Sequence, residues 1–107
     1  MYEGDWINDK PEGNGKYIYE NGEYYLGQYK NGKRHGKGKK YEIYNNERKL
    51  VYEGEYLNGI KHGKGKMYYS NGNIQYEGDW INNKREGNGK YIWENGEYYI
   101  GQFNIAI

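Results

Sequence analysis

The chain has 107 residues, a net charge of +1 and no cysteine. This length fits one domain at most, and the absence of cysteine excludes disulfides and thiolate metal sites. Only fifteen residues are Leu, Ile, Val or Phe, a low share that often marks disorder. However, the chain has sixteen Tyr and three Trp, and each large ring can bury much surface. We therefore expect a folded chain whose core consists mainly of rings.

A repeat organises the chain from its first residues onward. Each unit begins with Tyr, has Gly two positions later and an aromatic residue four positions later, and continues to Gly-x-Gly. Residues 2–29 and 76–103 differ at only five positions. A catalytic site needs unlike residues in unlike roles, so this repetition predicts a building block. We divide residues 1–107 into a single array with units at 2–24, 25–51, 52–75, 76–98 and a partial fifth unit at 99–107.

Each unit predicts one β-hairpin. In Tyr2-Glu3-Gly4-Asp5-Trp6, alternate residues share a face, as in a strand. Dipeptides that favour type I′ hairpin turns then follow at Asn21-Gly22, Asn71-Gly72 and Asn95-Gly96. Asn31-Gly32 and Asn58-Gly59 begin the other kind of connection. The sequence therefore predicts an all-β, elongated single-layer antiparallel β-meander of stacked hairpins, with about nine strands and a length of roughly 40 Å.

The recurring glycines are predicted to make room for rings, because a Tyr or Trp side chain can lie over the bare backbone of a neighbouring strand. The glycines to which we assign this structural role are Gly4, Gly13, Gly15, Gly27, Gly36, Gly38, Gly54, Gly63, Gly65, Gly78, Gly87, Gly89 and Gly101. On the other face, Glu or Asp of one strand is expected opposite a lysine of the next, namely Lys16, Lys39, Lys66 and Lys90.

The second unit departs from this pattern. It has Asn45-Asn46 in place of Asn-Gly, and its stretch "YEIYNNERKLVY" is four residues longer than the matching stretch of the first unit. Lys40 stands where the other units have Tyr or Met, which predicts a bulge or a change of register there. The extra residues form either a functional loop or a tolerated insertion.

Blocks such as "YEGDWINDKPEGNGKYIYENG" resemble MORN (membrane occupation and recognition nexus) repeats. The Tyr-x-Gly-x-aromatic head and the Gly-x-Gly at fixed offset match in four consecutive units, and a fifth head follows at 99–103. The resemblance implies an elongated, twisted β-meander with an aromatic-lined groove. Among relatives, such arrays are protein-interaction modules at membrane junctions, in cytoskeletal scaffolds and in ciliary radial-spoke heads, or appendages of enzymes.

Residues suited to catalysis or metal binding are few. Ser70 is the only Ser, Thr is missing, and His35 and His62 are the only histidines. Both histidines occupy the same repeat position, too far apart for a shared metal ion. The carboxylate pairs are expected to form a solvated ion-pair face at Glu3/Asp5, Glu53/Glu55 and Glu77/Asp79. "GNGK" and "GKGK" lack the spacing of phosphate-binding loops. We expect no catalytic residue, metal site or cofactor, and no enzyme activity.

Two surfaces are candidates for binding. The first is an aromatic groove for a peptide or helix of a partner protein, formed by Trp6, Tyr17, Tyr19, Tyr29, Tyr56, Tyr69, Trp80, Tyr91 and Trp93. These rings could instead pack only on each other and on glycine. The second is a basic patch formed by Lys30, Lys33, Arg34, Lys37, Lys39 and Lys40. It suits anionic lipid, an acidic protein segment or no ligand at all, and flanking acidic residues argue against nucleic acid.

These features predict a non-enzymatic scaffold or adaptor that binds a protein partner. The alternatives are an anionic-membrane or phosphoinositide adaptor that uses the basic patch, and an accessory repeat region of a larger enzyme. The sequence has neither a run of apolar residues long enough for a membrane span nor the apolar core of a secretory signal. We therefore expect a cytoplasmic location, with cytoskeletal, ciliary or membrane association implied by the resemblance. Open sheet edges also predict edge-to-edge self-association.

Overall fold

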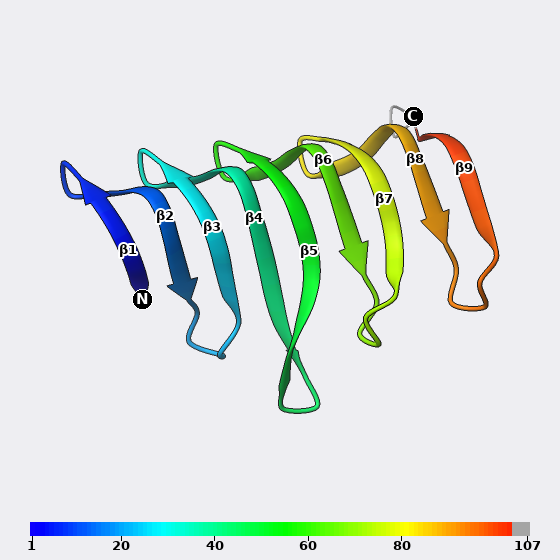
Figure 1. The fold of residues 1–107 in the computed structure, drawn as a ribbon, viewed down its shortest axis with the longest axis horizontal. Helices are drawn as coiled ribbons and strands as arrows, with labels where there is room; N and C mark the ends of the chain where they lie inside the picture. The colour runs from blue at the N-terminus through cyan, green and yellow to red at the C-terminus, as the bar shows by residue number, and fades with distance from the viewer. Residues whose placement is uncertain (104–107) are drawn as a thin grey trace.

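The computed structural model describes residues 1–103, which form one nine-stranded sheet with the strands in chain order (Figure 1). All neighbouring strands are antiparallel. The strands are β1 (Tyr2–Ile7), β2 (Lys10–Ile18), β3 (Tyr24–Lys30), β4 (Lys33–Tyr44), β5 (Glu47–Leu57), β6 (Ile60–Tyr68), β7 (Ile74–Ile81), β8 (Lys84–Ile92) and β9 (Tyr98–Phe103). The predicted all-β meander is confirmed.

The sheet is a single curved layer, with β1 and β9 at its two edges (Figure 1). Its principal extents are 46 × 33 × 21 Å. The described part of the chain has no helix of the length and apolarity that crossing a membrane requires. The partial fifth unit is described only as β9, so its residues 104–107 lie outside the described part.

Glycines face each other across the whole sheet. Gly4 of β1 lies opposite Gly15 of β2, Gly15 lies opposite Gly27 of β3, and the line continues to Gly101 of β9. The complete line is Gly4, Gly15, Gly27, Gly38, Gly54, Gly65, Gly78, Gly89 and Gly101. The fixed spacing inside each unit keeps this register, and tyrosine rings occupy the space over the bare glycine backbone.

The prediction of type I′ turns at the Asn-Gly pairs 21–22, 71–72 and 95–96 is wrong. Only the glycine of each pair has a positive φ, between 91° and 93°. The Gly22 N–H donates to the Tyr19 carbonyl at 3.0 Å, and the Asn21 side chain accepts from the Glu23 N–H at 2.9 Å. This local bond holds Asn21 out of the left-handed region, so the turn is of type I followed by a glycine, another common hairpin form.

Two-residue turns with positive φ at both positions occur elsewhere. They connect β1 to β2, β3 to β4, β4 to β5, β5 to β6 and β7 to β8, and each begins with Asn. Asn tolerates the left-handed region better than other residues with a Cβ atom. The type I′ turns are therefore Asn8-Asp9, Asn31-Gly32, Asn45-Asn46, Asn58-Gly59 and Asn82-Asn83.

The extra residues of the second unit lengthen two strands instead of forming a loop. β4 has 12 residues and β5 has 11, and Asn45-Asn46 closes their hairpin. Figure 1 shows this hairpin reaching beyond the neighbouring turns. The predicted change of register is confirmed, because the pairing shifts between Lys40 and Tyr41. Val51 of β5 is the extra, unpaired residue of this bulge, and it is buried.

Candidate functional site

The core is formed by rings on one face of the sheet, which we call the ring face. This layer of rings consists of the five tyrosines that begin the units (Tyr2, Tyr25, Tyr52, Tyr76 and Tyr99) and the five rings four residues later (Trp6, Tyr29, Tyr56, Trp80 and Phe103). Trp6 and Tyr99, in the edge strands, are exposed. Each tyrosine that begins a unit contacts, edge-on, the ring four residues later in its own unit. All of these tyrosines except Tyr99 also contact the equivalent ring of the next unit. The centroids are 4.9–5.5 Å apart, with interplanar angles of 77–89°. Edge-to-face contacts of this kind stabilise beyond their area burial.

The tyrosine that begins each unit lies over glycine, as predicted. A Cβ atom added at Gly65 would lie 2.6 Å from Cζ of Tyr52, and one added at Gly54 would lie 2.5 Å from the Lys64 carbonyl oxygen. The Tyr52 hydroxyl donates to the Glu55 carbonyl at 3.0 Å. The other four tyrosines make the same bond to the carbonyl three residues later, at 2.8–3.0 Å. Burial raises the pKa of Tyr52.

Four of the predicted glycines have a different role, because they form bulges instead of ring seats. Gly13, Gly36, Gly63 and Gly87 have φ values of 77–96°. In each case the next amide donates to a side chain of a neighbouring strand. Lys64 N–H bonds to Oε1 of Glu55 at 2.6 Å, and Asn88 N–H bonds to Oδ2 of Asp79 at 3.0 Å. The second acid of each predicted carboxylate pair therefore supports the backbone.

The opposite face carries the ion pairs that the sequence predicted. Glu53 lies opposite both Lys39 and Lys66, and Glu77 lies opposite Lys66. The Nζ to carboxylate distances are 3.7 Å for Lys39–Glu53 and 3.5 Å for Lys66–Glu77. These groups are solvent-exposed, so each pair contributes little to stability.

The predicted aromatic groove divides into a buried floor and exposed ends. Tyr29, Tyr56 and Trp80 are buried. In contrast, Trp6 is 56% exposed and Trp93 is 48% exposed. The remaining groove residues are half-buried or exposed: Tyr17, Tyr19, Tyr69 and Tyr91. A partner on this face would therefore contact the rings at the ends of the groove, while the floor rings hold the sheet together.

The predicted basic patch is divided between the two faces of the sheet. Lys39 pairs across from Glu53 and Lys37 across from Glu55, so both lie on the face opposite the rings. Arg34 lies across from Tyr29 on the ring face. Lys40 lies across from Tyr25 and Tyr52 on the same face. Lys30 and Lys33 pair with each other beside the β3–β4 turn and are exposed. Successive side chains of a strand point to opposite faces of the sheet, so the six cations do not form one surface.

Three cations lie over rings of the core, and sequence reasoning missed them as a group. Arg34 lies 5.3 Å from the ring centroids of Tyr25 and Tyr56. Lys61 lies 5.0 Å from Tyr52 and 5.2 Å from Trp80. Arg85 lies 5.7 Å from Tyr76 and 5.1 Å from Tyr91. All three stand nine positions after the tyrosine that begins their unit, which is the signal that could have revealed them. We call Arg34, Lys61 and Arg85 the cation row.

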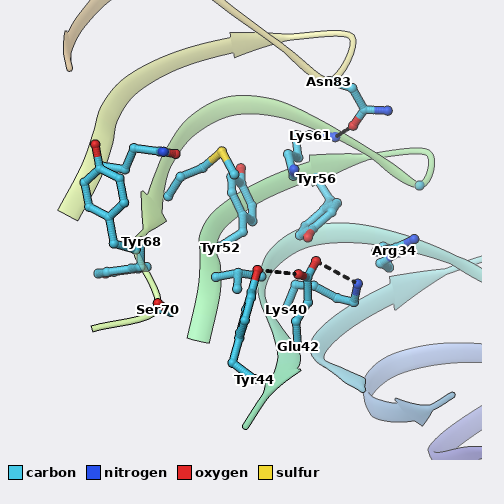
Figure 2. Close-up of a pocket in the computed structure, with 15 residues that line it drawn as sticks. Arg34, Lys40, Glu42, Tyr44, Tyr52, Tyr56, Lys61, Tyr68, Ser70 and Asn83 are labelled. Atoms are coloured by element: carbon cyan, nitrogen blue, oxygen red, sulfur yellow. Dashed lines mark hydrogen bonds and ion pairs between the residues drawn. The ribbon is translucent and has the colours of Figure 1, made fainter. Parts of the chain in front are cut away.

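A depression of about 630 Å³ lies on the ring face beside the long β4–β5 hairpin (Figure 2). Figure 2 shows Lys40 and Glu42 on one side of it, with Lys61, Tyr56 and Arg34 nearby. Lys40 Nζ pairs with Glu23 at 3.7 Å and with Glu42 at 3.9 Å. Burial raises the pKa of Tyr56 to about 12, although Arg34 opposes the shift. The Tyr56 hydroxyl is buried without a hydrogen-bond partner in the described structure.

A second depression, of about 500 Å³, continues the first along the sheet. Both are lined by Lys61, Met67, Gln75 and Asn83. The second also reaches Arg85 and Trp80. Together they form a groove that runs across the strands of the second, third and fourth units, and we call it the ring-face groove.

The histidines and carboxylates do not gather into a reactive cluster in the described part of the chain. No three His, Cys, Asp or Glu residues within residues 1–103 are placed to share a metal ion. The Nδ1 atoms of His35 and His62 are buried and lack a hydrogen-bond partner there. Asp79 is held by a hydrogen bond from Lys64, which is the main cause of its lowered pKa.

The comparison with known families agrees with this geometry. The model of the MORN repeat matches at residues 2–24, 25–41, 52–74 and 76–98. No curated protein shows significant similarity to the chain. The four matches cover most of the chain, and they coincide with the repeated ring-over-glycine hairpins. The chain therefore belongs to the MORN repeat family.

Proposed function

We propose that this protein is a non-enzymatic scaffold or adaptor that binds a partner protein through the ring face. The observation that carries the proposal is the single-layer sheet, in which residues 1–103 supply no second layer to cover the ring face. A row of rings, exposed at its ends and hollowed along its middle, offers rigid amphipathic area to a partner. MORN repeats occur in repeat and adaptor proteins, which is compatible with this role.

The repeated architecture supports a scaffold more than an enzyme. The carboxylates with a defined geometry, such as Glu55 and Asp79, bond to bulge amides, and Ser70 lies in the β6–β7 turn. We propose a cytoplasmic location, with a cytoskeletal or ciliary assembly as the setting that the family suggests. Self-association through β1 or β9 is a further proposal, because both strands lie at the edges of the sheet.

Affinity capture from the source cells tests the proposal with variants that spare the buried floor. Trp93→Ala removes an exposed ring from the ring face. Tyr98→Ala is the matched control, because Tyr98 is 61% exposed and pairs with Ile92 on the opposite face. We expect Trp93→Ala to lose proteins that the wild type and Tyr98→Ala both retain, with unchanged circular dichroism. Equal capture by all three proteins would contradict a partner on the ring face.

A membrane adaptor is the second candidate, favoured by the position of three lysines. Lys30, Lys37 and Lys39 are all on the face opposite the rings. Each cation near an anionic membrane contributes about 1 kcal/mol, but Lys39 is already paired with Glu53. Reversal of Lys30 and Lys37 to Glu should abolish salt-sensitive sedimentation with anionic vesicles. Sedimentation that does not change on reversal would exclude this mode of attachment.

A further inference from the structure

The cation row lacks acidic partners. Arg34, Lys61 and Arg85 are half-buried, yet within residues 1–103 none of them has a carboxylate within ion-pair distance. The neighbouring half-buried cation is neutralised, because Lys40 lies between Glu23 and Glu42. The ring-face groove is therefore left with unbalanced positive charge.

The surroundings of Lys61 strengthen this point. Burial lowers the pKa of Lys61, and the positive charges of Lys40 and Arg34 lower it further. Glu42 acts in the opposite direction but does not reach Lys61 as an ion pair. A half-buried cation that is repelled by its neighbours is unfavourable in the free protein. An anionic group beside Lys61 would relieve that repulsion.

The cations recur at one spacing along the groove. Each lies across from the second ring of its unit, as Arg34 does from Tyr29 and Arg85 from Trp80. Successive members are therefore two strands apart, which is roughly 10 Å at ordinary strand spacing. Carboxylates seven residues apart on an α-helix are also separated by about 10.5 Å on one face. The spacing of the cation row thus matches a helical ligand that carries one carboxylate every seven residues.

Continuity of the groove favours an elongated ligand. The two depressions share four lining residues, so they adjoin, and together they extend from Arg34 to Arg85. A flat membrane would not reach cations that are half-buried over rings. A nucleic-acid backbone carries a charge at each phosphate, denser than the row, and Glu42 lines the same groove.

We propose that the ring-face groove binds an acidic segment of the partner protein, with its carboxylates on Arg34, Lys61 and Arg85. The charged heads of these residues lie over rings, which restricts their motion and lowers the entropy lost on binding. This inference rests on the proposed function, and it names the chemistry of the partner.

Fluorescence anisotropy with synthetic peptides tests the inference. The probe is a fluorescein-labelled, alanine-rich helix of about 21 residues with three glutamates at seven-residue intervals. A second peptide of identical composition has the three glutamates adjacent. We expect the wild type to bind the spaced peptide several times more tightly, and we expect affinity to fall as salt rises. Absence of binding to the spaced peptide at millimolar protein, or equal affinity for both peptides, would overturn the proposal.

Charge variants locate the binding. The triple variant Arg34→Gln, Lys61→Gln, Arg85→Gln should weaken binding roughly tenfold or more. The control Lys30→Gln, Lys37→Gln, Lys39→Gln removes equal charge away from the rings and should change binding by less than about twofold. Equal losses would mean that net charge alone attracts the peptide, and they would overturn the proposal. The single variant Arg85→Gln, which removes cation contacts with Tyr76 and Tyr91 only, provides the same comparison if the triple variant does not fold.

Two further measurements separate the possible failures. Vesicles of phosphatidylcholine with phosphatidylserine replace the peptide in a sedimentation assay. Binding to vesicles that depends on the cation row, without binding to the spaced peptide, would assign the row to a membrane and overturn the proposal. In the capture experiment, retention of the partner by the triple variant but not by Trp93→Ala would refute the acidic ligand and leave the proposed function standing.

Discussion

Gly65→Ala should be among the most damaging single-atom additions to this protein. The new Cβ atom would lie 2.6 Å from Cζ and 2.7 Å from Cε1 of the Tyr52 ring. Carbon atoms normally approach to about 3.5–4.0 Å, so the ring must move by about an ångström. Tyr52 has no exposed surface, and it contacts Tyr56 at 5.3 Å and Trp80 at 5.5 Å. The ring therefore has no free space to enter.

The free energy of unfolding should fall by about 3 kcal/mol. Overpacking a tight core costs about 1–3 kcal/mol. Displacement of the ring also strains its hydroxyl bond to the Glu55 carbonyl and one edge-to-face contact, worth about 1 kcal/mol each. Gly72→Ala is the contrasting variant, because its Cβ would meet nothing within 4 Å and only its φ of 92° is strained. It should cost about 1–2 kcal/mol.

Urea unfolding followed by far-ultraviolet circular dichroism measures both losses. A double-mutant cycle then isolates the clash, because Tyr52→Leu removes the ring atoms that the added methyl group would meet. We expect Gly65→Ala to cost at least about 1.5 kcal/mol less in the Tyr52→Leu background. If it costs the same in both backgrounds, the ring over the glycine is not the reason for the destabilisation, and the packing described for the core would be wrong.

Three other predictions concern charge and turns. Asp79→Asn should destabilise the protein at neutral pH. The hydrogen bond from Lys64 is the first cause of the lowered pKa of Asp79. The stabilisation is therefore present above the unfolded pKa and is lost as pH falls through the folded pKa, so the difference in urea midpoint between wild type and variant should shrink on acidification. A difference that does not shrink would contradict this role. Burial raises the pKa of Tyr56 from 10.0 to about 12. The stabilisation of the fold by the neutral Tyr56 hydroxyl is therefore complete below pH 10 and is lost as pH rises to about 12. The melting temperature should fall steeply over this range, and it should fall less in Tyr56→Phe. Asn46→Gly should raise the free energy of unfolding by about 0.5 kcal/mol, because its φ is 62° and glycine suits that position. By contrast, Asn21→Gly should lower it by about 1 kcal/mol through loss of the bond that caps the turn; equal effects at both positions would refute the assignment of the two turn types.

The turn types and the glycine bulges differ from the sequence prediction for one reason, which is that side-chain hydrogen bonds decide both. Asn21-Gly22 and Asn31-Gly32 are identical dipeptides, yet only the second has both residues at positive φ. The choice depends on loop length and on the side-chain bond to Glu23, which the dipeptide alone does not reveal. Likewise, the bulges at Gly13 and its equivalents depend on an acceptor from the neighbouring strand. Sequence reasoning placed these glycines correctly in each repeat and gave four of them the wrong role.

The amino-acid pattern alone was enough to predict the repeat, the β-meander and the rings that lie over glycine. These features follow from fixed spacing within about 20 residues, because alternation along a strand and turn residues act locally. Which side chains share a surface depends instead on how the strands pair. The contiguous basic segment is divided between two faces, since Lys39 and Lys40 point opposite ways. Conversely, Arg34 and Arg85, which are distant in sequence, are aligned along one groove, because strand pairing stacks equivalent positions of successive units.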